Sequence, residues 1–119
     1  MTTGGRTTGP KRGDIVLVPF PFAELTAAKA RPAVVVSGDR YARTERKLVI
    51  AAITSNVQAR NGPMDFRLIE WRKSGLLKPS VITSWLATLS PALALIRIGE
   101  LSGPDLQAVA GRLRMALEL

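Results

Sequence analysis

The chain has 119 residues, enough for one compact domain but too few for two independent cores. Hydrophobic residues make up 46% of it and aromatic residues only 5%, so we expect a core of Val, Ile, Leu and Ala, and the net charge of +8 favours a polyanion or an acidic protein as partner. The absence of Cys excludes disulfides and thiolate metal sites, and the absence of His removes the usual general base at neutral pH and the commonest metal ligand.

The first ten residues, MTTGGRTTGP, predict a loose tail ahead of a single domain over residues 11–119. The tail lacks the apolar stretch of a secretion signal. No later segment has the ~18 consecutive apolar residues that a membrane span requires. We therefore expect a cytoplasmic protein with no membrane attachment.

Short apolar runs separated by turn residues predict that most of the domain is β-structure. The three strongest runs are 14–20, 32–37 and 48–55, and weaker ones follow at 65–69, 80–84, 86–89 and 95–98. The third run is apolar throughout, which indicates a strand covered on both faces. Residues 22–30 have no strong pattern and are predicted to be a loop. Such short strands are typical of a small barrel or a tightly curled sheet.

The pattern changes to a helical period near the C-terminus. Apolar residues recur at helical spacing from 106 to 117 and predict an amphipathic helix over 103–118, which would cover an open side of the barrel. Ser102 is suited to cap its first turn, where Pro104 is tolerated and Asp105 opposes the positive end of the helix dipole. The chain is therefore predicted to be mainly β, of the α+β class.

Polar residues stand where two of the apolar runs meet solvent. Arg31 precedes Pro32 at the entry to the second run, and its guanidinium could grip a phosphate through two parallel hydrogen bonds. Thr54, Ser55 and Asn56 end the third run. Both groups also fit a plainer interpretation, as a solvated strand end and a polar turn.

Lys78 and Ser80 raise the same pair of interpretations at the entry to a later strand. The sequence has no Gly-rich phosphate loop and no nucleophile elbow, and without His it has no Ser-His-Asp triad. Its few carboxylates show no spacing typical of an acid–base pair or a metal site. The residues favour metal-free chemistry on a phosphate, or binding alone.

Five segments in order carry a resemblance to a known family: KRGDIVLVPFPF, KARPAVVVSGD, LVIAAITSN, GLLKPSVITSWLATL and IGELSGPDLQAVAGRLRMALEL. Together they resemble the MazF/PemK toxins of type II toxin–antitoxin systems from about Lys11 to the C-terminus. The resemblance implies an SH3-like barrel of the CcdB/PemK type with a C-terminal helix. It also implies a homodimer that cuts single-stranded RNA without a metal or other cofactor, and an antitoxin whose tail blocks the cleft.

The same resemblance implies roles for particular residues. The family's catalytic arginine and threonine fall on Arg31 and Thr54. Ser55, Asn56, Lys78 and Ser80 are the next candidates, as RNA contacts. The implied reaction is attack of a ribose 2′-hydroxyl on the adjacent phosphorus, which leaves a 2′,3′-cyclic phosphate and a 5′-hydroxyl and which DNA cannot undergo. Because a guanidinium is a poor base in water, we expect Arg31 chiefly to stabilise charge on the phosphorane.

Two features of the sequence depart from the family. The loop 22–30, where the family has a lid over the RNA groove, lacks the glycine-rich stretch that many members have, and Ala87 stands where many members have a basic residue. Trp71 and Trp85 could stack on bases, although burial or a place in a dimer seam fits them better.

Two other functions stay open. One is a CcdB-like toxin that binds DNA gyrase without cutting RNA, and the other is a basic barrel that binds RNA without cutting it. The ARP and AITS segments favour the ribonuclease.

Overall fold

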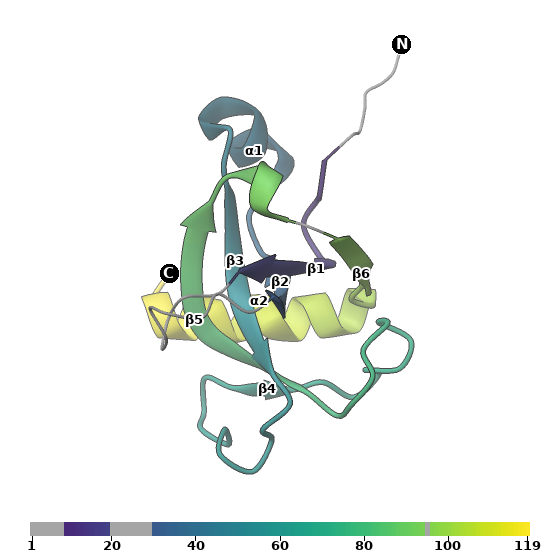
Figure 1. Cartoon of the computed structure of the whole chain (residues 1–119). Helices are drawn as coiled ribbons and strands as arrows, with labels where there is room; N and C mark the ends of the chain where they lie inside the picture. Colours follow the sequence, from purple (N-terminus) through teal and green to yellow (C-terminus); the bar gives the residue numbers. More distant parts are fainter. Residues whose placement is uncertain (1–8, 20–29, 95) are drawn as a thin grey trace.

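A computed structural model describes residues 9–19, 30–94 and 96–119, and Figure 1 shows a curled sheet crossed by a long helix. The elements in chain order are β1 (Asp14–Pro19), β2 (Ala30–Val35), α1 (Asp39–Glu45), β3 (Leu48–Thr54), β4 (Phe66–Arg67), β5 (Val81–Leu89), the short 3₁₀ helix η1 (Pro91–Leu93), β6 (Ile96–Glu100) and α2 (Gly103–Leu117). The predicted class, mainly β with a C-terminal helix, is confirmed. Most of the predicted tail and the loop 22–30, except Ala30, lie outside the described residues.

The strands form one six-stranded sheet in the order β4-β5-β3-β2-β1-β6, and every neighbouring pair is antiparallel. Register shifts interrupt the β1–β6 pairing at Ile15/Val16 and the β3–β5 pairing between Ala51 and Ile53. Such irregularities increase the local twist and bend of a strand. They account for the curl of the sheet, which matches the predicted barrel-like architecture (Figure 1).

Hydrophobic residues are buried on both faces of the sheet because side chains alternate along each strand. On the first face, the α2-side cluster joins Ile15, Val34, Ala51 and Ile53 with Val109 of the helix. On the opposite face, a smaller cluster includes residues such as Val16, Ala33 and Ile50. The central strand β3 is thus covered on both sides, as its continuous apolar run predicts.

The helix α2 begins as predicted. The Ser102 hydroxyl accepts a hydrogen bond of 3.2 Å from the backbone N–H of Asp105, in a first turn that also holds Pro104. Of the predicted apolar stripe, Val109 is fully buried, whereas Leu117 is 52% exposed. The stripe therefore packs on the sheet along the middle of the helix but not at its end. No helix among the described residues is long and apolar enough to cross a membrane.

Several elements differ from the prediction. β2 begins at Ala30, inside the predicted loop 22–30, and the short helix η1 was not predicted. α1 was not predicted either, because none of its residues is buried and it therefore has no apolar periodicity. The runs 80–84 and 86–89 are one strand, β5, which bends at its irregular pairing with β3 instead of breaking. The strand predicted over 65–69 contains only the two residues of β4, although the Leu68 N–H donates to the Ser80 carbonyl at 2.9 Å, in register with the β4–β5 pairs.

Candidate active site

One cleft contains all six residues that the sequence proposes as catalytic or RNA-contacting, but not Trp71 or Trp85. It has a volume of about 720 Å³ and lies where β2 and β3 end beside the loop 75–80. Its polar lining is Arg31, Thr54, Ser55, Asn56, Lys78 and Ser80. Residues from three distant parts of the chain are therefore brought together by the fold.

The antiparallel register of β2 and β3 explains why Arg31 and Thr54 meet. Ala33 pairs with Ala52 in this register, and continuing it by two residues sets Arg31 opposite Thr54. Two-residue steps keep a side chain on the same face of the sheet, so both functional side chains share the face of Ala33 and Ala52. That face is opposite the one covered by α2, whereas Ile53, Leu76 and Ile98 of the cleft belong to the α2-side cluster, so the cleft lies where the strand ends bring the two faces together.

Among the described residues, the Thr54 hydroxyl makes one hydrogen bond. The backbone N–H of Asn56 donates to Thr54 Oγ1 at 3.1 Å, in a local turn directly after β3. A hydroxyl that accepts this bond keeps its own proton for another acceptor. Thr54, which lines the cleft, can therefore donate this proton to a bound group.

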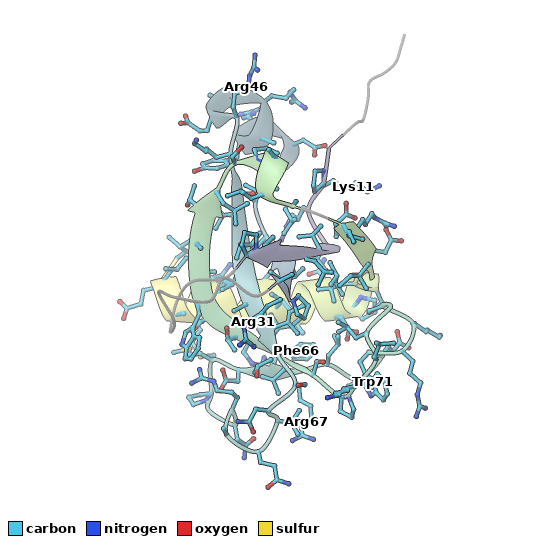
Figure 2. All side chains as sticks on the ribbon, in the orientation of Figure 1. Lys11, Arg31, Arg46, Phe66, Arg67 and Trp71 are labelled. Atoms are coloured by element: carbon cyan, nitrogen blue, oxygen red, sulfur yellow. The ribbon has the colours of Figure 1, made fainter. Side chains whose placement is uncertain are left out.

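Arg31 is an exposed cation in the lower half of the molecule, well separated from Arg46 at the end of α1 (Figure 2). Within the described residues it forms no ion pair with a carboxylate. Lys78 supplies a second cation, and no Asp or Glu is among the described residues that line the cleft. The cleft is therefore suited to an anion such as a phosphodiester.

Ser80 differs from the other polar residues because it is only 3% exposed. Its hydroxyl donates to the Lys78 carbonyl oxygen at 2.8 Å, and its own carbonyl accepts from Leu68. These bonds fix the backbone of the loop at Lys78. Ser80 thus lines the base of the cleft and holds the segment that carries Lys78.

The sequence analysis did not identify the apolar wall of the cleft or the glycine that shapes it. The wall consists of Leu17, Pro32, Ile53, Leu76, Leu77 and Ile98, next to Gly75. Gly75 has a φ of +92°, and a Cβ added there would lie 2.6 Å from the Ile98 carbonyl oxygen. The segment GLLKPS contains this glycine before Lys78, but only the tertiary contact with β6 reveals why a glycine is needed there.

The chain offers little that would hold a metal ion. It contains no His or Cys. In the part of the chain that the structure describes, no three carboxylates come close enough together to form a metal site.

A family model shows which group of proteins shares this fold and these motifs. The model for the PemK-like, MazF-like toxin of type II toxin–antitoxin systems matches residues 11–117. The chain belongs to this toxin family. The resemblance recognised in its sequence motifs is thereby confirmed. Comparison with curated individual proteins gives no match.

Solved structures of other family members have the same fold. MazF from Deinococcus radiodurans is 22% identical, with a TM-score of 0.75 over 95% of this chain and 100% of that one. An endoribonuclease in complex with its cognate antitoxin, from a mycobacterial species, is 21% identical, with a TM-score of 0.74 over 92% and 96% of the two chains. The Mycobacterium tuberculosis toxin MazF-mt6 is 21% identical, with a TM-score of 0.72 over 89% and 97%.

Proposed function

We propose that this toxin is an endoribonuclease that cuts single-stranded RNA at short sequence motifs without a metal ion. The observation that carries the proposal is the pairing of Arg31 and Thr54 in a cleft with two cations and no carboxylate among its described lining residues. Two of the similar structures are endoribonucleases from mycobacterial species, which supports the same activity here.

The proposed reaction is a transesterification within the RNA backbone. The 2′-hydroxyl gives its proton to a water molecule, and its oxygen forms a bond to the adjacent phosphorus. The bond from phosphorus to the 5′-oxygen breaks, and that oxygen takes up a proton from water, so no proton is gained or lost overall. The products are a 2′,3′-cyclic phosphate and a 5′-hydroxyl, and no oxidant, reductant or further reactant is needed.

Arg31 and Thr54 act on the negative charge that develops at phosphorus. The guanidinium of Arg31 donates to the nonbridging oxygens, and the Thr54 hydroxyl donates its free proton to the same group. Donors fixed in place before the reaction stabilise such a transition state with little reorganisation. Removing one of them typically lowers the rate by ~10²–10³.

The remaining polar residues of the cleft bind the RNA. Ser55 and Asn56 contact the backbone beside the scissile phosphate, Lys78 neutralises a neighbouring phosphate, and Ser80 supports the Lys78 segment and offers an acceptor oxygen. The strand must be unpaired, because a base-paired helix cannot bring the 2′-oxygen in line with the leaving oxygen.

The proposal extends to the partners of the toxin. Similar structures include MazE–MazF from Deinococcus radiodurans and a mycobacterial endoribonuclease with its cognate antitoxin. We infer that a cognate antitoxin neutralises this toxin too, that the toxin acts as a homodimer, and that it inhibits translation and growth by cutting RNA in the cytoplasm.

The test is incubation of the purified protein with a long single-stranded RNA in EDTA, followed by mapping of every new 5′ end. We expect discrete cuts with 5′-hydroxyl ends, and a loss of activity in Arg31→Ala and Thr54→Ala while their unfolding transitions stay close to that of the wild type. Arg43→Ala removes an equivalent charge from α1, far from the cleft, and should cut at the wild-type rate. Folded wild-type protein that leaves several RNAs intact would contradict the proposal.

A further inference from the structure

Two tryptophans form the same pair with an arginine but lie in different surroundings. The Arg72 guanidinium lies 4.6 Å from the ring centre of Trp71, and the Arg60 guanidinium lies 4.5 Å from that of Trp85. Trp71 also packs against the α2-side cluster. Trp85 is not in either core cluster and is 51% exposed. Core packing therefore explains Trp71 but leaves the exposed ring of Trp85 without a role.

Trp85 lies on the same face of the sheet as the proposed catalytic residues. Ala87 and Leu89, two and four residues further along β5, pack in the cluster opposite α2, and alternation places Trp85 on their side. Arg31 and Thr54 share that face on β2 and β3. Because β2, β3 and β5 are consecutive in the sheet, the three residues lie on neighbouring strands, although the β5 residue directly opposite Thr54 is Val81.

The pairing of β3 with β5 sets the distance between Thr54 and Trp85. Ala51 pairs with Leu86 and Thr54 with Val81, so Trp85 is two residues from Thr54 counted along β3 and four counted along β5, across the register shift. At ~3.3 Å per residue this offset is roughly 7–13 Å. A base next to a phosphate bound at Thr54 can reach the ring.

Local bonds hold the ring and its arginine in place. The backbone N–H of Trp85 donates to the Thr83 hydroxyl at 3.1 Å, and that hydroxyl donates to the Ala52 carbonyl at 2.9 Å. Arg60 forms a 3.1 Å salt bridge with Asp65, whose side chain is nearly buried. The backbone at Trp85 and the Arg60 guanidinium beside its ring are therefore held before any ligand binds.

Trp85 and Arg60 are not among the described residues that line the cleft. From this geometry we propose that Trp85, backed by Arg60, stacks on an unpaired base where the RNA leaves the cleft, near the scissile phosphate, and so positions the strand. The proposal rests on the endoribonuclease function. An aromatic ring beside cations is typical of sites for single-stranded nucleic acid. A second copy of the chain fits less well, because a twofold seam centred on this patch would bring Arg60 close to its own copy.

The test uses the full-length protein with Arg31→Ala, which prevents cleavage, and Trp71→Phe, which leaves Trp85 as the only fluorescent tryptophan. The probes are an oligouridylate of about 12 nucleotides and an abasic sugar–phosphate chain of equal length. Both carry the same charge, but only the first can stack. We expect the oligouridylate to quench the Trp85 emission and the abasic chain to leave it unchanged.

Binding affinity gives a second readout. Trp85→Ala should weaken oligouridylate binding by about 5- to 150-fold, and Trp85→Phe should weaken it less. Arg60→Ala and Arg72→Ala each remove one charge and one cation–π pair, and because Arg60→Ala also breaks the salt bridge with Asp65, its unfolding transition is measured beside that of the wild type. Only Arg60→Ala should reduce affinity by more than the loss of one charge does.

Three results would overturn the stacking proposal: equal quenching by both probes, unchanged affinity in Trp85→Ala, or a Trp85→Ala variant that loses its dimer mass but binds RNA normally. Cleavage by the wild-type protein is measured beside these titrations. If the wild type cuts RNA and Trp85→Ala cuts it with an unchanged KM, the stacking proposal is wrong and the endoribonuclease proposal is retained. If the oligouridylate alone quenches Trp85 but the wild type cuts no RNA, the endoribonuclease proposal is wrong, although Trp85 still stacks on a base.

Discussion

Substitution of Gly75 tests whether the contact between the loop 75–80 and β6 shapes the cleft. A Cβ at residue 75 would lie 2.6 Å from the Ile98 carbonyl oxygen and 2.9 Å from Ile98 Cγ2. Both separations are shorter than any normal van der Waals contact of a side chain. The backbone φ of +92° adds strain for any residue other than glycine.

The expected loss of stability follows from the strained φ and from the close contacts with Ile98. A side chain at a left-handed φ costs ~1–2 kcal/mol, and overpacking a fitted site costs ~1–3 kcal/mol. We expect Gly75→Ala to lower the free energy of unfolding by about 2–5 kcal/mol, a large part of the ~5–15 kcal/mol typical of a domain. Movement of the loop away from β6 would relieve the clash and displace Lys78.

Urea unfolding followed by circular dichroism measures the stability, and an RNA cleavage assay at low urea measures the activity of the folded fraction. We expect a lower midpoint together with a raised KM for RNA. Gly62→Ala is the matched control, because its Cβ would lie 3.5 Å from the nearest atom, an ordinary contact with Asp65. A Gly75→Ala protein with wild-type stability and wild-type KM would refute the argument.

Three further substitutions test separate parts of the account. Gly111→Ala places a methyl group where no atom lies within 4 Å in the middle of α2, so it should raise the free energy of unfolding by ~0.5–1 kcal/mol, and a lower urea midpoint would contradict this. Thr54→Ser keeps the hydroxyl that accepts from Asn56 and should retain most of the cleavage rate, whereas Thr54→Val should lose ~10²–10³ of it; equal rates in both variants would exclude a role for the hydroxyl. Lys78→Ala should weaken the binding of all RNA sequences to a similar extent and make the slope of log binding constant against log salt concentration shallower by about 0.7. Filter binding over a salt series measures this slope, and an unchanged slope would show that Lys78 does not contact a phosphate.

The elements that sequence patterns predicted correctly are those with a buried face. β1, β2 and β3 are apolar runs with turn residues at their ends, and α2 has a helical apolar period with Ser102 as its cap. α1 was missed because no residue in it is buried. The division of β5 into two strands was wrong because a bend at an irregular pairing leaves no turn residue in the sequence.

The functional site shows a second limit of prediction from sequence patterns. Spacing along the chain identified Arg31 and Thr54 as polar residues at strand ends, but it could not show that they face one another, since the register between β2 and β3 is a tertiary property. The same holds for Gly75, whose need for a missing Cβ depends on Ile98 of β6. Nor can composition distinguish Trp71 from Trp85, because their difference is one of burial.

The central claim is that the RNA's own 2′-hydroxyl attacks the phosphorus bound between Arg31 and Thr54. The most direct test uses two oligonucleotides that span a mapped cut and differ only in having ribose or 2′-deoxyribose on the 5′ side of the scissile phosphate. In EDTA, we predict cleavage of the all-ribose strand to a 2′,3′-cyclic phosphate and a 5′-hydroxyl, with no cleavage of the deoxy strand at that position. Cleavage of both strands at the same bond, or loss of cleavage in EDTA alone, would contradict the account.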